Sequence, residues 1–408
     1  MAEVKIEKLG RQGDGIFFEN GREVFVPYSL PDDMLEIAGK GPRRSISKIV
    51  QPSANRIAAV CKHFGTCGGC QLQHMNEQAY EGWKLGLLED ALQKVGITEK
   101  PDRLVSYPVA SRRKAVFSAN RKDGELQFGF TKAGSNDLVS IDECPVLDAL
   151  LQQELTNLTA FAASLPLGGR PNRISVLATD NGLDVNVEDI RIKSDVQQRA
   201  LVRKALDLGF ARLSLDGEQI IEARKPVLTM GKASIVPPPG AFVQAIEAVE
   251  KDMTELVSKH LSDAKKVADL YCGIGTFALR LAEKSQVWAL EDNEAAINSL
   301  DRAWRETAGE LKQLSSEVRN LERRPASFKE LKKMDGLVFD PPRAGAELQS
   351  MQIAKSRVSR VAAVSCNPTT LARDLAILLD GGYTIKEIVA FDQFRFTHHL
   401  ETIVLLEK

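Results

Sequence analysis

The stretch Val267–Leu281, VADLYCGIGTFALRL, decides how the C-terminal part of this chain folds. A short apolar run ends at Asp269 to Tyr271, a tight glycine turn follows at Gly273 and Gly275, and an apolar-periodic segment with helix character comes next. Strand, turn and helix in this order match the G-x-G-x-x-G/A turn, in which glycines let a ligand approach the backbone at a helix N-terminus. The stretch therefore predicts a site for an adenosine-containing cofactor.

A second apolar run, residues 286–290, ends at Glu291. Glu291 lies 22 residues beyond Asp269, and an acidic side chain at such an offset commonly accepts hydrogen bonds from ribose hydroxyl groups. A glycine pattern alone does not distinguish one adenosine cofactor from another. The reaction must therefore be inferred from other parts of the chain.

Two further apolar runs in the last third of the chain end in chemically active side chains. LVFDPPR, residues 337–343, places Asp340 before two prolines, and VAAVSCNP, residues 361–368, ends just beyond Cys366. Strand and helix signals alternate over residues 239–408, which predicts a doubly wound parallel sheet. Because ligands bind at the carboxyl ends of the strands in such a sheet, we expect Asp340 and Cys366 at the ligand-binding edge.

The pair Cys366 and Glu401, the last residue of the motif HHLE, suggests one reaction. C5 of a pyrimidine is not nucleophilic enough to accept a methyl group unaided, but a thiolate that adds to C6 makes C5 carbanion-like. A base must then remove the C5 proton so that the thiolate can leave. The pair therefore predicts C5 methylation of a pyrimidine, with Cys366 as nucleophile, Glu401 as base and the glycine turn as the site of the methyl donor.

The patterns divide the chain into three predicted domains. Residues 1–52 contain short alternating strands and tight turns such as Asn20-Gly21, which is typical of a small β-barrel. Residues 53–238 mix helix and strand signals and form a central α+β domain, up to a proline-rich boundary. Residues 239–408 form the predicted catalytic domain.

Four of the six cysteines form a candidate metal site in the central domain. Cys61, Cys67 and Cys70 lie within the loop 61–70 at C-x5-C-x2-C spacing, and Cys144 can complete a set of four. Four thiolates suit tetrahedral zinc or an iron–sulfur cluster. The spacing leaves both open, although a distant lone cysteine before a proline favours the cluster.

Composition limits the class of protein. The chain has 408 residues, 43% of them hydrophobic, and a net charge of −1. An apolar run of membrane-spanning length and a signal peptide are both missing from the sequence, so we expect a cytoplasmic protein without membrane contact. The balanced charge argues against non-specific coating of nucleic acid, so RNA would bind through local basic patches such as Arg43-Arg44 or 112–114. We expect a monomer.

The segment from Phe242 to the C-terminus, with CGIG, DPPR, SCNP and HHLE in this order, resembles the RNA 5-methyluridine methyltransferase family. With the upstream CGGC, the resemblance covers nearly the full length. KIEKLGRQGDGIFFENGREVFVPYSLP resembles a TRAM domain, an OB-like RNA-binding module, with Asp32 where glycine usually follows Leu-Pro. The family implies an α/β, doubly wound Rossmann-like methyltransferase domain, preceded by a TRAM/OB-like barrel and the central α+β domain.

The resemblance also implies roles for individual residues. It assigns Cys366 as nucleophile and Glu401 as base. The residues that it implies for S-adenosyl-L-methionine, in addition to the turn glycines Gly273 and Gly275, are Gln244, Tyr271, Glu291 and Asp340. The implied ligands of a [4Fe–4S] cluster are Cys61, Cys67, Cys70 and Cys144.

Three positions depart from the family pattern. Ile246 replaces an asparagine after the F-x-Q motif, so one contact near that turn is expected to be missing. Arg319-Asn320-Leu321 lies where an acidic residue usually contacts the cofactor, which leaves the adenine environment open. Arg395 replaces a proline before THH, which predicts either an altered loop before Glu401 or an added phosphate contact.

The resulting prediction is an S-adenosyl-L-methionine-dependent RNA methyltransferase that forms 5-methyluridine, with 23S rRNA as the expected substrate and transfer RNA as the alternative. Two other classes remain. A non-catalytic iron–sulfur RNA-binding protein would explain the departures, and an NAD-dependent oxidoreductase would use the same glycine turn. The oxidoreductase leaves Cys366 and DPPR unexplained.

Overall fold

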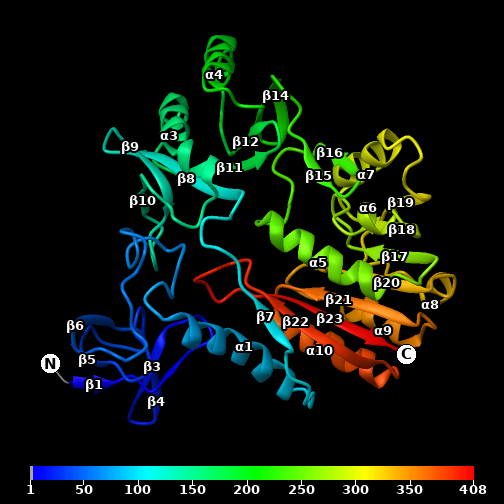
Figure 1. The fold of residues 1–408 in the computed structure, drawn as a ribbon. Coiled ribbons are helices and arrows are strands. Elements are labelled where there is room, and N and C mark those ends of the chain that lie inside the picture. Colours follow the sequence, from blue (N-terminus) through cyan, green and yellow to red (C-terminus); the bar gives the residue numbers. More distant parts are fainter. Residues whose placement is uncertain (1–2) are drawn as a thin grey trace.

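The structure is a computed structural model and describes residues 3–408. Its strands form five sheets, and these follow the chain from two small N-terminal sheets through a central sheet to a large C-terminal sheet (Figure 1). None of the helices within residues 3–408 is long and apolar enough to cross a membrane.

The N-terminal part is built from two small antiparallel sheets. One contains β1 (Glu3–Lys5), β5 (Met34–Ala38) and β6 (Ser45–Gln51), and the other contains β2 (Lys8–Leu9), β3 (Gly15–Glu19) and β4 (Arg22–Val26). Asn20 and Gly21 both have positive φ, 51° and 76°, as a two-residue type I′ hairpin turn requires. The buried side chains form a small apolar core: Ile6, Phe17, Val24, Val26, Leu35 and Ile37.

The central part is a seven-stranded sheet in the order β10-β9-β8-β11-β12-β13-β14. Its strands are β8 (Lys114–Lys122), β9 (Glu125–Thr131), β10 (Leu138–Ser140), β11 (Asn172–Thr179), β12 (Gly182–Glu188), β13 (Arg212–Leu215) and β14 (Glu218–Glu222). The helices of this part are α2 (Ala149–Gln153), α3 (Leu155–Ser164) and α4 (Asp195–Asp207). A two-stranded hairpin, β15 (Leu228–Met230) and β16 (Ala233–Ile235), follows.

The C-terminal sheet has eight strands in the order β19-β18-β17-β20-β21-β23-β22-β7. The parallel strands are β17 (Lys266–Leu270), β18 (Gln286–Glu291), β19 (Leu314–Val318), β20 (Gly336–Phe339) and β21 (Arg360–Ser365). The order reverses between β17 and β20, as in doubly wound folds. This sheet confirms the predicted Rossmann-like α/β class.

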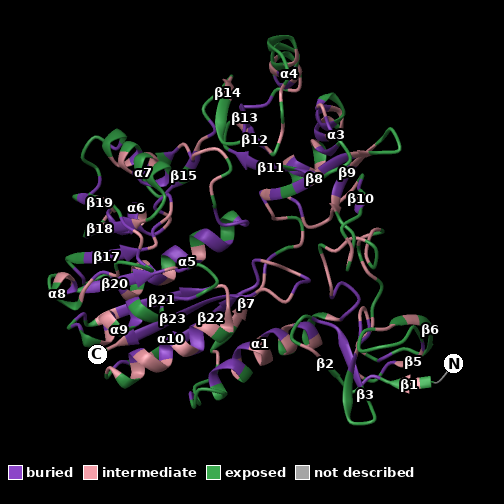
Figure 2. Cartoon of the chain, turned by 180° about the vertical axis from the view of Figure 1, so that it is seen from behind, coloured by how far each residue is buried: buried purple, intermediate pink, exposed green. Residues whose placement is uncertain are grey.

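Helices cover both faces of the C-terminal sheet, which gives it two apolar cores (Figure 2). One core includes α5 (Glu247–His260), α6 (Ala278–Leu281) and α7 (Glu294–Glu306). The other includes α1 (Glu77–Gln93), α8 (Phe328–Leu331), α9 (Glu347–Lys355) and α10 (Pro368–Asp380). The inner strands β17, β20 and β21 are almost wholly buried between them, so the ends of these strands, which carry the site, are held by packed neighbours.

The last two strands of the C-terminal sheet, β22 (Thr384–Phe391) and β23 (Glu401–Glu407), differ from the predicted all-parallel arrangement. β23 runs antiparallel to both β21 and β22. The loop at residues 392–400, which connects β22 to β23, explains this direction. It is too short for the crossover connection that two neighbouring parallel strands need.

A segment from the predicted central domain also joins this sheet. β7 (Arg103–Val105) pairs in parallel with β22, and α1 packs beside α10. The apolar residues of the predicted helix 71–95 thus face the C-terminal part, and the three predicted domain limits stay a prediction.

Candidate active site

The candidate active site begins where β17 and β20 end side by side. Asp340 follows β20, and its amide donates to the carbonyl of Leu270 at 3.2 Å. Tyr271 follows β17 with a φ of 62°, a left-handed conformation that is uncommon outside glycine and that turns the chain sharply toward the glycines. The sequence therefore places Tyr271 and Asp340 together at the point where the strand order reverses.

The turn after β17, residues 271–275, requires glycine for a steric reason. Gly275 has a φ of 96°, and a Cβ atom there would lie 2.4 Å from Cδ1 of Leu300 on α7. The turn is closed by a 2.8 Å hydrogen bond from the Gly275 amide to the Cys272 carbonyl. Gly275 thus lets the turn pack against α7, while Gly273 faces the open side.

Glu291 at the end of β18 is held by backbone amides. Its carboxylate accepts hydrogen bonds from Gly273 N at 3.0 Å and from Asn293 N at 2.9 Å. The carboxylate thereby connects the glycine turn to the start of α7, and it still lines the cavity beside the turn. This is the position from which the sequence predicts contact with a ribose.

Antiparallel pairing brings Cys366 and Glu401 to the same edge of the sheet. Ser365 at the end of β21 pairs with Thr402 at the start of β23, so the residues just beyond this pair, Cys366 and Glu401, are neighbours. Asn367 caps α10 through Thr369 N, with Pro368 in the first turn, which fixes the chain directly after Cys366. A parallel β23 would have carried Glu401 to the opposite edge.

One cavity of about 570 Å³, the catalytic cavity, is lined by almost all the predicted catalytic and cofactor-binding residues. Of the predicted set, these residues line it: Gln244, Tyr271, Gly273, Glu291, Asp340, Cys366 and Glu401. Gly275 lies behind the turn and does not. The geometry therefore assembles the predicted side chains, and the role of each one stays a prediction.

Two buried carboxyl groups, Asp340 and Glu401, line this cavity, and the charge of Asp340 acts on Glu401. The pKa of Glu401 is raised to about 8, chiefly by burial and also by the Asp340 charge, against an opposing effect of Arg343 and Gln393. Burial also raises the pKa of Asp340 to about 7. A base with a pKa near neutrality is suited to accept a proton in the reaction.

The Cys366 thiol is only partly exposed, and its surroundings favour the protonated form. Its pKa is raised to about 11, chiefly by burial and also by the charges of Glu401 and Asp340, while Arg343 opposes this rise. A nucleophilic thiolate therefore needs help from a nearby proton acceptor or a cation. Glu401 is the nearby proton acceptor, and Arg343 is the nearby cation.

Gln393, which the sequence analysis missed, connects the predicted residues. Its side-chain amide donates to Oε1 of Gln244 at 2.7 Å, and it is also among the groups that lower the pKa of Glu401. Gln393 is 1% exposed and lies in the loop before β23. The sequence around Gln393, eight residues before Glu401, does not indicate a role in the site. Gln393 reaches Gln244 only because this loop folds back toward it.

The four predicted metal ligands, Cys61, Cys67, Cys70 and Cys144, line a second cavity of about 570 Å³, the cysteine cavity. The cysteine loop is attached to the central sheet by hydrogen bonds from Gly68 N to Thr131 O and from Ala133 N to Thr66 O. As arranged in residues 3–408, no group of three or more His, Cys, Asp and Glu side chains could hold a metal ion. The thiols thus share a cavity, and a bound metal centre stays a prediction.

Phe242, Arg343 and Phe394 line both cavities. The guanidinium of Arg112, beside Cys70 and Cys144, lies 5.5 Å from the ring centroid of Phe394. The cysteine cavity and the catalytic cavity are therefore separated by little more than these side chains.

The predicted basic patch at residues 112–114 is wrong as a solvated RNA-binding surface. Arg113 is buried and forms a 2.6 Å ion pair with Glu250, and Lys114 donates to the Ala241 carbonyl. These cations pack the central part against the C-terminal part. The Arg43 side chain in the N-terminal part stays more than half exposed, although it also pairs with Asp14.

The departures from the family pattern are accommodated locally. Ile246 is buried in the core of the C-terminal part. Asn320 lines the catalytic cavity and donates to Asp292 at 2.8 Å. Arg395 donates to Glu77 and to the Tyr107 carbonyl, so it anchors the loop before Glu401 and is not free for a phosphate.

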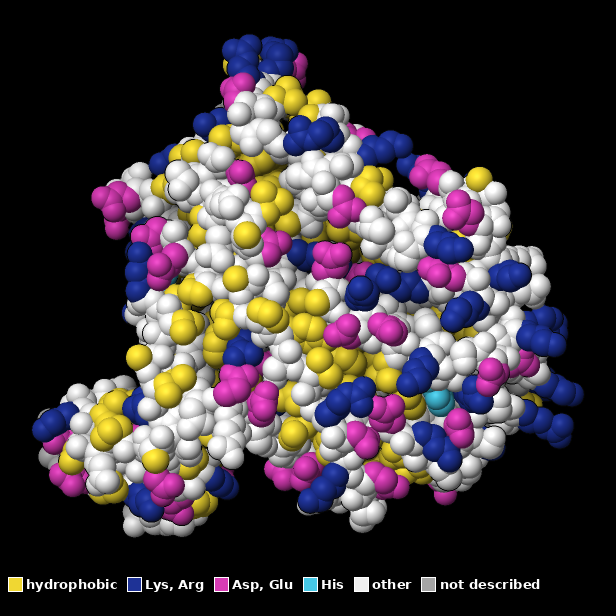
Figure 3. Space-filling model, in the orientation of Figure 1, with side chains coloured by type: hydrophobic (Ala, Val, Ile, Leu, Met, Phe, Trp, Pro, Cys, Tyr) yellow, Lys and Arg dark blue, Asp and Glu magenta, His cyan; other side chains and the backbone are white. Residues whose placement is uncertain are grey.

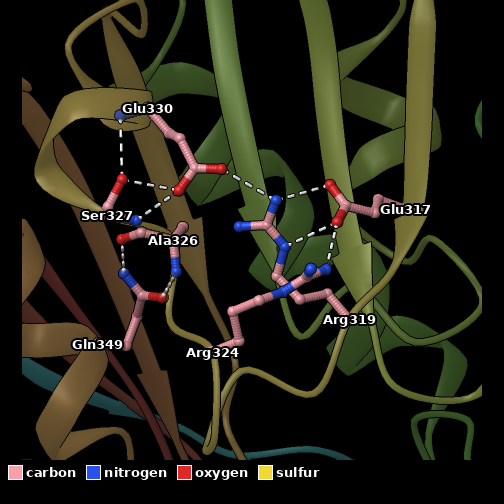
Figure 4. A network of polar contacts seen from close by, with 7 residues as sticks. All are labelled: Glu317, Arg319, Arg324, Ala326, Ser327, Glu330 and Gln349. Atoms are coloured by element: carbon pink, nitrogen blue, oxygen red, sulfur yellow. Dashed lines mark hydrogen bonds and ion pairs between the residues drawn. The ribbon is translucent and has the colours of Figure 1, made fainter.

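The turn that carries Asn320 is braced by Arg319 (Figure 4). The Arg319 guanidinium, which is mostly buried, bridges Glu317 at 2.7 Å and Glu330 at 3.0 Å. Glu330 also closes a capping box with Ser327 at the start of α8. Where the family pattern has an acidic residue, this chain therefore has a network around Arg319 that holds the backbone of the Asn320 turn beside the catalytic cavity.

Comparisons with known proteins bear on this site. The sequence pattern of the family described as tRNA (Uracil-5-)-methyltransferase matches residues 234–408. An uncharacterized RNA methyltransferase of Mesorhizobium japonicum is 46% identical over 407 residues, which cover 100% of this chain and 98% of the relative. The 23S rRNA (uracil(1939)-C(5))-methyltransferase RlmD of Vibrio vulnificus is 29% identical, over 100% of this chain and 96% of the relative.

A solved structure has a similar fold over the whole chain. It is the tRNA (uracil-54, C5)-methyltransferase of Pyrococcus abyssi in complex with S-adenosyl-L-homocysteine, with a TM-score of 0.77 and 24% identity. The likeness covers 99% of this chain and 100% of the other. At this identity it shows the fold alone.

Proposed function

Because this chain belongs to the RNA 5-methyluridine methyltransferase family, we propose that it methylates uridine C5 through a covalent bond between Cys366 and C6 of the base. The observation that carries this proposal is the pairing of Ser365 with Thr402, which brings Cys366 and Glu401 together at one edge of the sheet. Both side chains line the cavity that also contains the glycine turn.

The donor, S-adenosyl-L-methionine, follows from the family, and the cavity fits it. Glu291 would accept hydrogen bonds from the ribose, Tyr271 and Asn320 would lie along the nucleoside, and Asp340 would face the sulfonium charge. When bound, the donor supplies an electrophilic methyl group. A sulfonium cation near Asp340 would favour the ionised form of that buried carboxyl group.

We assign the remaining steps to Cys366 and Glu401. Cys366, as the thiolate, bonds to C6, and the electron pair displaced toward C5 bonds to the methyl group, whose bond to the sulfur of the donor breaks. Glu401 then removes the C5 proton, the C5–C6 double bond reforms, and the C6–S bond breaks to release the thiolate. Gln393 keeps the Glu401 carboxyl beside Gln244 during this step.

The experiment that tests this mechanism follows a labelled methyl group from the donor into unmodified RNA. Cys366→Ala should lose turnover and form no covalent RNA–protein species. Glu401→Gln should form that species and fail to release it. Full activity of Cys366→Ala would refute the covalent mechanism, and release at the normal rate by Glu401→Gln would remove Glu401 from the base role.

We propose 23S rRNA as the substrate, because the full-length relative from Vibrio vulnificus is named for that RNA. A local basic surface supports an RNA partner: Lys and Arg side chains gather over α4 (Figure 3), and Arg199 and Arg203 of this helix are both exposed, one turn apart. Assays with 23S rRNA fragments and transfer RNA transcripts in parallel would separate the two substrates. Methylation of transfer RNA alone would overturn the proposal.

We also propose that Cys61, Cys67, Cys70 and Cys144 hold a [4Fe–4S] cluster. The chemistry of the donors suits the cluster, because four thiols line one cavity and soft sulfur ligands suit iron–sulfur clusters. When bound, the cluster would link the cysteine loop to Cys144 and stabilise this region. Iron and sulfide analysis of anaerobically purified protein would test the proposal, and stoichiometric zinc without iron would contradict it.

A further inference from the structure

The loop at residues 392–400, here called the base loop, determines where Glu401 lies. It leaves the sheet after Phe391 and returns at Glu401 without forming a helix or strand of its own. Phe396 in this loop has a φ of 64°, which an aromatic residue adopts only when its surroundings hold it there. Contacts from outside the loop must therefore fix its backbone.

Lys84 on α1 supplies the most concentrated set of these contacts. Its ammonium donates to Oδ1 of Asp392 at 2.8 Å, to the Phe394 carbonyl at 3.4 Å and to the His399 carbonyl. An ammonium group has three donors, so all of them are used on the base loop. The contacts at Asp392 and His399 hold the two ends of that loop together.

Tyr80, one turn earlier on α1, completes the contact. Its hydroxyl donates to Oδ2 of Asp392 at 2.9 Å and accepts the amide of Phe396 at the same distance. Residues four apart on a helix share a face, so Tyr80 and Lys84 present one polar surface to the loop. The carbonyl of Phe396 is also held, by the amides of Gln71 and Leu72 that follow the cysteine loop.

This contact is unusual because both charges are fully buried. Lys84 and Asp392 each have 0% side-chain exposure, and burial of an ion pair carries a desolvation cost that attraction often fails to recover. Burial lowers the pKa of Lys84, and the carboxylate of Asp392 opposes that change. Two apolar side chains in place of Lys84 and Asp392 would also pack α1 against the loop. Stability alone therefore does not explain why a lysine and an aspartate are found there.

We propose that Lys84 is a positioning residue for Glu401: by binding both ends of the base loop, its ammonium holds the catalytic carboxylate beside Cys366. The inference rests on the proposed function of Glu401 as the base. It assigns to a helix in the N-terminal half of the chain a role in the proton-removal step.

The test measures turnover, donor affinity and the covalent RNA adduct for Lys84→Met. A misplacement of about 1 Å can lower a rate about 10²-fold, so we expect a loss of that order in kcat. Because the defect lies in proton removal, the adduct should accumulate as in Glu401→Gln. Binding of S-adenosyl-L-homocysteine, measured by calorimetry, should not change. Tyr80→Phe keeps the ring and should show the same pattern to a smaller degree.

Arg212→Met is the matched control. Arg212 and Asp184 form another buried ion pair, at 2.6 Å with 4% exposure on each side, in the central sheet. Its loss lowers stability without touching the base loop, so the folded fraction should decrease while the adduct does not accumulate. If Lys84→Met does not fold, Tyr80→Phe carries the test.

Each outcome is decisive. Adduct accumulation in Lys84→Met or Tyr80→Phe, and none in Arg212→Met, supports the proposal. If Glu401→Gln traps the adduct while the foldable α1 variants do not, the positioning role is refuted and the proposed function stands. If Glu401→Gln traps none, the base role of Glu401 is refuted, and the positioning role with it.

Discussion

The catalytic cavity has two halves that are built in different ways. The cofactor half, around the glycine turn, comes from consecutive residues: β17, the turn at 271–275 and the start of α7 hold one another through Glu291. The base half depends on distant partners, since Lys84 reaches Asp392 across 308 positions of the chain. The first half is a local motif, and the second exists only when α1 docks against the sheet. Variants in each half should therefore fail in different ways.

The largest expected effect is on the base half and comes from pH. The pKa of Glu401 is raised to about 8 and that of Asp340 to about 7, so both lose their charge as the pH falls through this range. Because the base must be ionised, kcat/KM should fall about tenfold or more for each pH unit below 7. A pH–rate profile measured on stable protein tests this, and a flat profile between pH 6 and 8 would contradict it.

The next largest effect is on the cofactor half. Gly275→Ala adds a Cβ at a φ of 96° and 2.4 Å from Leu300, so it combines backbone strain with overpacking and should cost about 3 kcal/mol of unfolding free energy. Affinity for S-adenosyl-L-homocysteine should fall with it. Denaturant unfolding and calorimetry measure the two quantities.

Gly273→Ala is the control for that variant. Gly273 has a φ of 54°, and the surroundings leave the added Cβ with nothing within 4 Å. Strain alone should cost about 1 kcal/mol. Equal losses of stability for the two alanine variants would show that contact with α7 is not the reason for Gly275.

Loss of Gln393 should lower kcat about fivefold. Gln393→Ala removes the 2.7 Å bond to Gln244 and the group that opposes the raised pKa of Glu401, at a cost of about 1 kcal/mol for one hydrogen bond. We therefore expect lower kcat and an acidic limb of the pH–rate profile that moves to higher pH. An unchanged profile with reduced kcat would limit Gln393 to contact with the substrate.

Glu401 also connects pH with stability. Its pKa is raised in the folded state, so its contribution to stability is fully present below the ordinary carboxyl pKa and is lost as the pH rises through about 8. Glu401→Gln should therefore raise the thermal midpoint at pH 9 relative to the parent and lose that advantage at pH 4. Equal midpoint differences at both pH values would refute the raised pKa.

The smallest effect should come from the network beside the adenine end of the cavity. Arg319→Met breaks a mostly buried bridge between Glu317 and Glu330 and should weaken S-adenosyl-L-homocysteine binding by a few fold, about 1 kcal/mol or less. Arg324→Met, which removes an exposed partner of the same Glu317, is the control and should change little. Equal effects would show that Arg319 does not shape the cavity.

Much of the site could be predicted from the sequence because its parts are short motifs at strand ends. The order of strand, glycine turn and helix determines the place of Tyr271 and Gly273, and the apolar runs before Asp340 and Cys366 determine theirs. The predicted doubly wound parallel sheet did not include the reversed direction of β23, because the apolar pattern of a strand is the same in either direction. That reversal is what places Glu401 at the correct edge.

The sequence by itself determined the fold class, the glycine turn and the choice of candidate reactive side chains, because these depend on local spacing and on the chemistry of each residue type. Only the tertiary structure decided that Arg113 is a buried ion-pair partner, that Gln393 connects Gln244 with Glu401, and that Lys84 holds the base loop. The physical reason is that such contacts join residues whose separation along the chain carries no periodic signal. These contacts form only after α1 has packed against the C-terminal sheet and water has been excluded. The buried polar atoms then have only one another as hydrogen-bond partners.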